Sequence, residues 1–217
     1  MSVDQPAAKR TVITRRHALA ALGLAAAGLA APGFVRRAGA ALDANDMVLG
    51  DPGAPITMIE YASLTCPHCA SFHNDTFPRI KTEYIDTGKV RLIYRDFPTR
   101  PVALAIFAAM LARCAGRDGF FGFIEVLYRT QESWLRAYDP VKALGKIARL
   151  GGVSQAKLDA CSNDKDLFQS IRNAQAQANR EFGVRATPTF IINGEKVEGP
   201  ASYDRLKDIL DRMLAKS

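Results

Sequence analysis

The stretch ITMIEYASLTCPHC, residues 56–69, decides the fold because it joins an apolar run almost directly to a pair of cysteines. Residues 56–62 are mostly apolar and follow the turn-forming sequence Asp51-Pro52-Gly53, which is typical of a buried strand. From Cys66 onward, apolar residues, cysteine and histidine recur at helical spacing: Cys66, Cys69, Phe72, His73, Phe77 and Ile80. The sequence therefore predicts a strand that leads into a helix, with Cys66 at the helix N-terminus.

The segment after this helix predicts a second strand. Pro78 is expected to kink the helix, which should end at Gly88. Apolar residues then alternate with Arg91 and Arg95, and this pattern indicates a strand that stops at Phe97-Pro98. A strand, helix, strand unit is thereby complete.

The second half of the chain is expected to be helical first and to return to strands later. Residues 99–182 show no convincing strand. Their amphipathic runs are residues 102–115, 119–135, 139–150 and 164–182, which we interpret as one helical insertion. Residues 189–192 and 195–198 flank Asn193-Gly194, the strongest short signal for a β-hairpin, and residues 203–214 form a closing amphipathic helix. These elements together predict an α/β fold.

The cysteine pair at the predicted strand–helix junction indicates redox chemistry. Unpaired N–H groups and the helix dipole at a helix N-terminus stabilise negative charge, so Cys66 is the expected thiolate nucleophile. Cys69, one turn later and more buried, is the expected resolving thiol. Pro67 and His68 lie between them and adjust the redox balance. The His68 ring is expected to donate a hydrogen bond to the Cys66 sulfur or to carry positive charge beside it, which favours the reduced form.

A cysteine pair of this spacing has two other uses: a structural bridge and part of a zinc site. Cys66, Cys69 and His73 fall on one helical face and offer three metal ligands, but no fourth ligand is visible, since His68 lies on the wrong face. We therefore expect no metal or other cofactor. His73 is expected to be a surface residue near the site.

A second informative motif is Ala186-Thr187-Pro188-Thr189, where a proline opens an otherwise regular strand. Proline cannot donate a hydrogen bond to a sheet, and a cis bond in a tight turn is a common reason for its presence. The motif by itself leaves cis and trans open.

The cysteine motif at residues 66–69, the long helical insertion and residues 183–194 (GVRATPTFIING) together resemble the DsbA-like branch of the thioredoxin superfamily. The resemblance implies a thioredoxin fold with an inserted helical domain. It also implies that Pro188 is cis and lies against the cysteine pair, and that Thr187 contacts the sulfur or a substrate strand. Glu60 matches the acid that this family buries beneath its active site as a proton acceptor; the alternative is a glutamate facing solvent at a strand edge.

The sequence departs from the best-known member of this family at two places. Thr187 stands where that member has an aliphatic residue, and threonine there also occurs in isomerase and reductase relatives. Cys114 and Cys161 are additional, and they are left for each other once Cys66 and Cys69 pair locally. A bridge closing a loop of about 48 residues stabilises a protein by at most roughly 4 kcal/mol, so we expect a structural disulfide, with a regulatory role as the alternative.

The N-terminal segment is different in kind from the rest. Residues 1–41 combine a basic start, an apolar run over residues 18–35 and a cluster of small residues at Ala38-Gly39-Ala40-Ala41, the layout of a signal peptide. Residues 14–19, TRRHAL, resemble a twin-arginine export signal. An uncleaved membrane anchor is the alternative.

The positive charge of the chain lies mostly in this leader. The 217 residues carry a net charge of +7, but residues 1–41 hold six of the 29 Lys and Arg residues and one of the 22 acidic residues, which leaves +2 for the rest. No basic tract or patch of interleaved basic and aromatic residues remains, so we do not expect this protein to bind nucleic acid. A composition of 48% hydrophobic residues also excludes a disordered chain.

The sequence thus predicts a periplasmic DsbA-like oxidase that introduces disulfide bonds into exported proteins. Expected partners are extended, cysteine-containing exported chains and a membrane redox partner of DsbB type, and the enzyme is expected to be a monomer. The alternatives are a disulfide isomerase or reductase on the same fold, and a periplasmic copper or zinc chaperone. The expected parts are a leader (1–41), two thioredoxin-fold parts (42–97 and 183–217) and the helical insertion (98–182).

Overall fold

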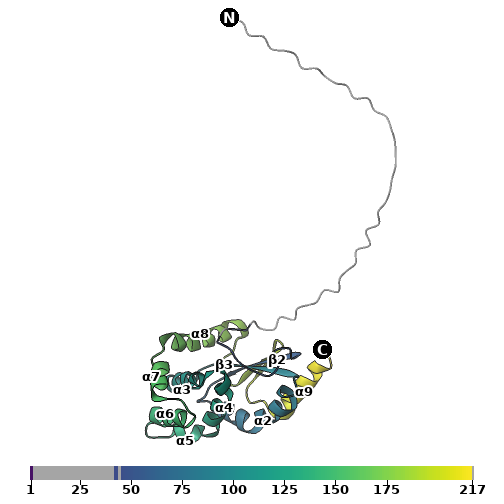
Figure 1. Cartoon of the computed structure of the whole chain (residues 1–217). Coiled ribbons are helices and arrows are strands. Elements are labelled where there is room, and N and C mark those ends of the chain that lie inside the picture. Colours follow the sequence, from purple (N-terminus) through teal and green to yellow (C-terminus); the bar gives the residue numbers. More distant parts are fainter. Residues whose placement is uncertain (2–41, 44, 217) are drawn as a thin grey trace, which may run out of the picture. The chain divides into compact units, whose positions relative to one another are not determined.

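A computed structural model describes Met1, residues 42–43 and residues 45–216 (Figure 1). Apart from Met1, the expected signal peptide lies outside the described residues. None of the described helices is both long enough and apolar enough to cross a membrane.

A five-stranded mixed sheet forms the centre of the fold. Its strands are β1 (Met47–Leu49), β2 (Ile56–Ala62), β3 (Val90–Asp96), β4 (Thr189–Ile192) and β5 (Glu195–Glu198). The strand order is β1-β3-β2-β4-β5; β2 and β3 are parallel and the other neighbours are antiparallel. The four longer strands were predicted from the sequence. β1 was not, because three residues are too few to show an alternating pattern.

The helix after β2 alternates between α-helical and π-helical segments. It consists of α1 (Pro67–Ser71), the π-helical turn η1 (Phe72–Thr76), α2 (Phe77–Ile80) and a second π-helical turn η2 (Lys81–Ile85). A proline in a helix cannot donate a backbone hydrogen bond and crowds the carbonyl four residues earlier. The helix continues past Pro78 to Ile85, and the π turn that precedes this proline ends at Thr76.

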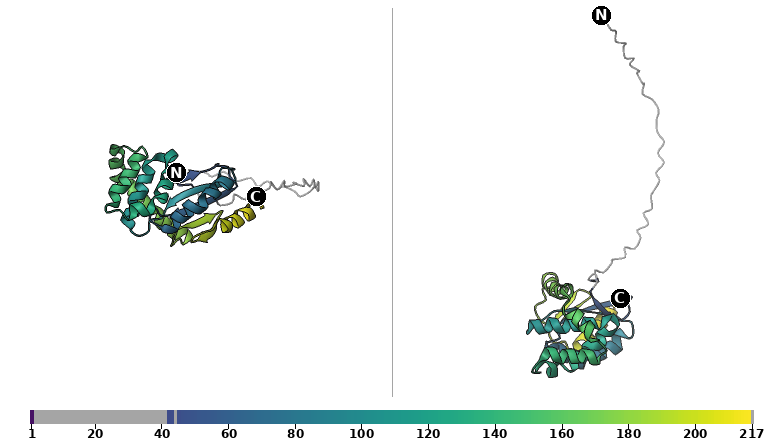
Figure 2. Two further views of the ribbon diagram at one scale, coloured as in Figure 1. Left: turned by 90° about the horizontal axis from the view of Figure 1, so that it is seen from below. Right: turned by 60° about the vertical axis from the view of Figure 1, so that its left-hand side comes forward.

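The helical insertion contains six helices and is followed near the C-terminus by a further one. These helices are α3 (Val102–Cys114), α4 (Gly116–Arg129), α5 (Gln131–Leu135), α6 (Pro140–Leu150), α7 (Gln155–Ser162), α8 (Lys165–Phe182) and α9 (Tyr203–Leu214). The predicted run 119–135 is divided at Thr130. α7 was not predicted, since it buries a single residue, Leu158. In Figures 1 and 2, α3, α5, α6 and α7 gather at one end of the sheet.

Helices cover both faces of the sheet, and this arrangement positions the candidate site. Phe72 of η1 and Leu206 of α9 pack with Met58 on one face, while Ala178 of α8 packs with Tyr61 on the other. All of β2 is buried. Because side chains alternate along a strand, Glu60 shares the face of Met58, which is also the face covered by the helix that begins after Cys66.

Candidate active site

Cys66 caps the N-terminus of α1 at the end of the loop that leaves β2. Its backbone is extended, its amide donates to Ser63 O at 3.0 Å, and Pro67 is the first helical residue. Cys66 and Cys69 are both free thiols, so the described state is the reduced one. Only 7% of Cys66 is exposed. The structure thus has the strand-to-helix junction that the sequence predicted.

The surroundings of Cys66 favour its thiolate. A hydrogen bond with the Cys69 thiol is the largest effect, and it lowers the pKa of Cys66 to about 5 although burial acts in the opposite direction. Hydrogen bonds from the Thr187 side chain and from the backbone amides of Cys69 and His68 lower this pKa further. A thiolate is therefore the main form of Cys66 at neutral pH.

The Thr187–Pro188 peptide bond is cis and brings Thr187 against the cysteine pair. In the thiol form, the Cys66 Sγ donates to Thr187 O at 3.4 Å. The Thr187 hydroxyl is buried and has no hydrogen-bond partner among the described residues. This hydroxyl is available to donate to Cys66 once the sulfur is ionised. The Arg100–Pro101 bond is also cis, which the sequence did not predict.

Pro67 and His68 lie on the surface between the two cysteines. Among the described residues, the His68 ring makes no hydrogen bond, so the expected contact between the ring and Cys66 is not found in this state. It is the backbone amide of His68 that favours the thiolate. Any role of the His68 ring remains a prediction.

Cys69 lies one turn into the helix and is fully buried. Burial raises the pKa of the Cys69 thiol well above its usual value, and the neighbouring Cys66 and the charge of Glu60 raise it further. The two cysteines are therefore strongly unequal. The Cys66 thiol is ionised at neutral pH, whereas the buried Cys69 thiol stays protonated.

Glu60 is completely buried, so the alternative of a glutamate at a solvent-exposed strand edge is wrong. The expectation that His73 lies on the surface is also wrong, because His73 is only 4% exposed. Its Nε2 lies 3.0 and 3.1 Å from the two carboxylate oxygens of Glu60. The helical spacing had already placed His73 on the face of Cys66 and Cys69, and that signal was sufficient to find it. Whether Glu60 accepts a proton remains a prediction.

The insertion contributes a residue that sequence reasoning missed. Gln131, at the start of α5, is buried and donates from Nε2 to Leu64 O at 2.8 Å and to Cys66 O at 3.0 Å. These two hydrogen bonds anchor the loop that contains Cys66, and they attach it to the helical insertion. No local pattern marks a glutamine for this role, because its partners lie more than sixty residues earlier in the chain.

Cys114 at the end of α3 is bonded to Cys161 in α7, the pairing expected from the sequence. This disulfide ties together two helices of the insertion. Cys114 belongs to the same buried cluster as Cys66 and Cys69, and Cys161 packs against that cluster.

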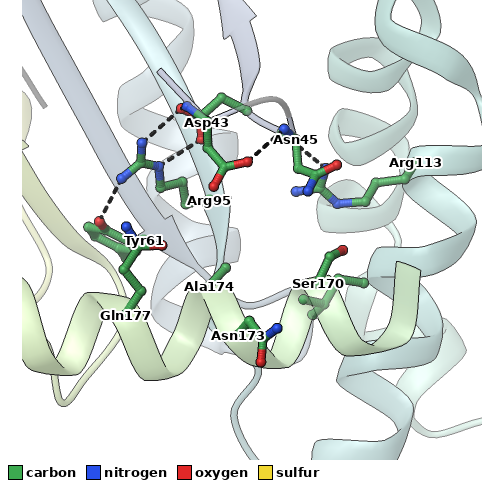
Figure 3. Close-up of a pocket in the computed structure, with 11 residues that line it drawn as sticks. Asp43, Asn45, Tyr61, Arg95, Arg113, Ser170, Asn173, Ala174 and Gln177 are labelled. Atoms are coloured by element: carbon green, nitrogen blue, oxygen red, sulfur yellow. Dashed lines mark hydrogen bonds and ion pairs between the residues drawn. The ribbon is translucent and has the colours of Figure 1, made fainter. Parts of the chain in front are cut away.

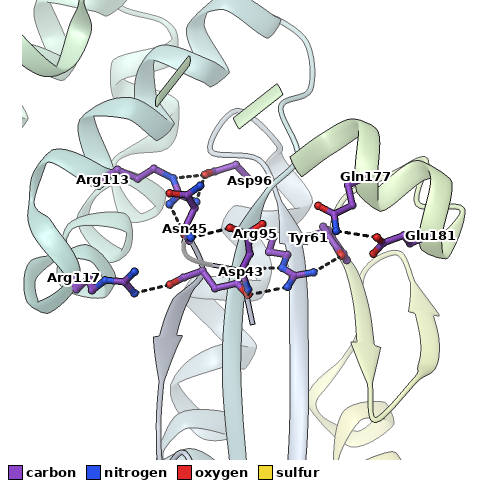
Figure 4. Close-up of polar contacts among 10 residues, drawn as sticks. Asp43, Asn45, Tyr61, Arg95, Asp96, Arg113, Arg117, Gln177 and Glu181 are labelled. Carbon is purple, nitrogen blue, oxygen red and sulfur yellow. Dashed lines mark hydrogen bonds and ion pairs between the residues drawn. The ribbon is translucent and has the colours of Figure 1, made fainter. Parts of the chain in front are cut away.

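A polar cavity of about 180 Å³ lies on the opposite face of the sheet, beside α8 (Figure 3). Both arginines that line it have carboxylate partners: Arg95 donates to Asp46 and to the Tyr61 hydroxyl, and Arg113 donates to Asp96, which lies outside the cavity lining (Figure 4). These contacts connect the segment before β1 to β3 and α3. We therefore interpret Arg95–Asp46 and Arg113–Asp96 as structural ion pairs.

Metal ligands do not converge around the cysteine pair. Across the described part of the chain, no group of three or more His, Cys, Asp or Glu side chains is arranged to hold a metal ion. The arrangement instead suits sulfur chemistry: an ionised thiol near the surface, a protonated thiol behind it, and a buried carboxylate and imidazole underneath.

Comparison with known proteins agrees with this geometry. The family model described as thioredoxin matches residues 43–212. A crystal structure of Wolbachia pipientis alpha-DsbA1 superposes with a TM-score of 0.74 at 36% identity and covers 81% of this chain and 94% of the other. BdbD from Bacillus subtilis superposes with a TM-score of 0.68 at 26% identity, covering 78% and 93%.

A Rickettsia typhi protein provisionally named a protein-disulfide oxidoreductase is 35% identical over 177 residues, which are 80% of this chain. The chain spans about 63% of the length of that relative.

Proposed function

Because the chain belongs to the thioredoxin family, in its DsbA-like branch, we propose that it is a thiol–disulfide exchange enzyme that oxidises exported proteins through Cys66 and Cys69. The family match includes both cysteines and the cis proline. The thioredoxin fold with inserted helices, expected from the resemblance, is confirmed by the same comparisons.

The proposed reaction begins from the oxidised enzyme. A substrate thiolate attacks the Cys66 sulfur, the Cys66–Cys69 bond breaks, and Cys69 leaves as a thiolate that takes up a proton. A second substrate thiolate then attacks the substrate sulfur of the mixed disulfide. The substrate disulfide forms, Cys66 leaves as a thiolate, and the enzyme has gained two electrons.

The oxidising direction follows from the hydrogen-bonded surroundings of Cys66 at the N-terminus of α1, which lower the pKa of this thiol to about 5. Whatever stabilises the thiolate stabilises the reduced enzyme, and this makes the enzyme disulfide a stronger oxidant. A thiolate of low pKa is also a good leaving group when the mixed disulfide is resolved. A disulfide isomerase or reductase on the same fold is the alternative.

The same proposal includes partners and location. Substrates are extended, cysteine-containing chains that bind beside Thr187 and Pro188, and a membrane partner of DsbB type takes the two electrons from the reduced enzyme. Residues 1–41 act as the export leader to the periplasm. The mature enzyme acts as a monomer built from residues 42–97, 98–182 and 183–217.

The redox equilibrium of the Cys66–Cys69 pair against glutathione tests this function. A variant with Cys114→Ala and Cys161→Ala leaves one redox pair to be measured, and the unsubstituted protein shows whether the second disulfide shifts it. We expect a potential above about −180 mV. A potential near or below about −250 mV would identify a reductase. Tight binding of copper or zinc by the reduced protein would instead favour the metal chaperone.

A further inference from the structure

The buried pair Glu60 and His73 lies beneath the two cysteines and takes no part in making or breaking the sulfur–sulfur bonds. Their side chains are 0% and 2% exposed, and they come from β2 and η1. An isolated carboxylate in the protein interior is costly unless a partner donates a hydrogen bond or carries a compensating charge. His73 supplies that partner, with Nε2 within 3.1 Å of both carboxylate oxygens.

Aromatic rings fix the imidazole in place. Tyr128 of α4 stacks on the His73 ring with centroids 4.3 Å apart and an interplanar angle of 14°. Phe77 of α2 and Tyr94 of β3 contact it at centroid distances of 4.9 and 6.1 Å. The Tyr94 and Tyr128 hydroxyls are hydrogen-bonded to each other at 2.8 Å.

These tyrosines remain neutral near neutral pH. Burial raises the pKa of Tyr94 and of Tyr128 well above the usual value. On β3, the nearby Asp96 is paired with Arg113. The tyrosines and Asp96 are thus accounted for. Of the described titratable groups around the buried Glu60–His73 pair, Cys69, Glu60 and His73 remain as candidates to exchange a proton.

His73 also connects this interior to the surface. It lines an open pocket of about 330 Å³ between α2, η2 and α4, together with Lys81, Glu125 and Arg129. One ring nitrogen binds Glu60, and Nδ1 makes no hydrogen bond to any described residue. An imidazole can accept a proton at one nitrogen and release it from the other.

We propose that His73 is a proton-relay residue: together with Glu60 it moves the Cys69 proton between the buried sulfur and solvent in this pocket. When the reduced enzyme is reoxidised, Cys66 is held in a mixed disulfide and the Cys69 thiol must ionise. Its proton passes to Glu60, is shared with His73 Nε2, and leaves from Nδ1. The Cys69 thiolate attacks the Cys66 sulfur, the new Cys66–Cys69 bond forms, and the partner sulfur leaves as a thiolate. Substrate oxidation uses the same path in reverse.

This relay rests on the proposed roles of Cys66 and Cys69, but not on whether the enzyme works as an oxidase or a reductase. Both directions require the buried Cys69 to gain or lose a proton. The two steps of exchange distinguish the relay from the role of Cys66, because attack by the Cys66 thiolate requires no proton transfer in the interior, whereas attack by Cys69 requires its buried thiol to lose a proton first.

Stopped-flow oxidation of the reduced protein by glutathione disulfide resolves these two steps. The single tryptophan, Trp134, is buried in the same cluster as Cys66 and Cys69 and serves as the fluorescent probe. The first phase, attack by Cys66, depends on the glutathione disulfide concentration, and the second, attack by Cys69, does not. His73→Gln keeps a hydrogen-bond donor toward Glu60 but cannot carry a proton. Thr82→Ala, which alters the same pocket away from Glu60, is the matched control.

We expect His73→Gln to slow the second phase about tenfold or more at neutral pH and to change its pH profile, with the first phase unchanged. Glu60→Gln should slow the second phase similarly, and the double variant should be no slower than the slower single variant. A second phase of unchanged rate in His73→Gln overturns the relay, as does slowing by Glu60→Gln alone. Failure of the first phase in the unsubstituted protein would instead overturn the role of Cys66.

Removal of a buried histidine can prevent folding, so the unsubstituted protein provides a second test. With a proton in transit, the second phase should be slower in deuterium oxide than in water, and the first should change much less. Equal rates of the second phase in the two solvents would overturn the relay.

Discussion

At the scale of single residues, Thr187 is the group that responds to ionisation of Cys66. Its carbonyl accepts a hydrogen bond from the thiol, and its buried hydroxyl has no other partner among the described residues. Deprotonation removes the first bond and makes the sulfur an acceptor for the hydroxyl. One residue can therefore satisfy both forms of the sulfur, and it favours the thiolate because a hydrogen bond to a charged group is the stronger one.

Thr187→Val should raise the pKa of Cys66, because valine keeps the shape of threonine but cannot donate to the thiolate. We expect a rise of about one unit and a potential lowered by about 30 mV. The ultraviolet absorbance of the thiolate, followed against pH, measures the pKa of Cys66. The redox equilibrium with glutathione measures the potential. Thr189→Val is the control, since its hydroxyl donates to Ala186 O. Equal Cys66 pKa values in both variants would contradict the role of Thr187.

At the scale of elements, α5 holds the active-site loop through one side chain. Gln131→Ala should remove both hydrogen bonds to that loop and leave two buried carbonyls, Leu64 O and Cys66 O, with fewer donors. We expect the free energy of unfolding to fall by about 1–3 kcal/mol. Denaturant unfolding measures this change. Gln155→Ala removes an exposed glutamine and should have little effect; equal losses in the two variants would contradict the proposed anchoring.

The sequence was informative where the relevant interactions are local. The junction of β2 with α1, the Asn193-Gly194 hairpin and α9 were predicted because periodicity and turn residues determine them. β1 and α7 were missed, since one is too short and the other buries too little to show a pattern. The helical spacing gave the correct helix face for His73, but the prediction that this residue is exposed was wrong. Exposure depends on what packs over a helix face, and here the ring of Tyr128, from a helix distant in sequence, covers His73.

At the scale of the whole molecule, the site is assembled from every part of the described fold. β2 and α1 supply Glu60 and both cysteines, the insertion supplies Tyr128 and Gln131, and the segment before β4 supplies Thr187. The stability of the whole chain should therefore depend on the redox state of the pair. The ionised Cys66 is stabilised only when these segments are folded together.

The pH dependence of this difference has a definite sign. The pKa of Cys66 is about 5 in the folded state and 9.0 as its ordinary value, so the stabilisation of the reduced form is complete above about pH 9 and is lost as the pH falls through 5. Cys69 contributes little below about pH 8, because its raised pKa keeps it protonated in the folded state and its ordinary pKa of 9.0 keeps it mostly protonated in the unfolded state. The oxidised protein has neither thiol and is the reference in which the other titrating groups cancel.

Unfolding of the two redox forms from pH 5 to pH 8 measures this effect. The free energy of unfolding of the reduced form should rise relative to that of the oxidised form, by at most about 1 kcal/mol per pH unit after allowance for solvent screening at the sulfur. The disulfide also constrains the unfolded chain, but this effect does not vary with pH. It therefore shifts the difference in unfolding free energy between the two forms by a constant and does not change how that difference varies with pH. A difference independent of pH would mean that Cys66 titrates alike in the folded and unfolded chain, and an oxidising cysteine pair would then no longer be expected.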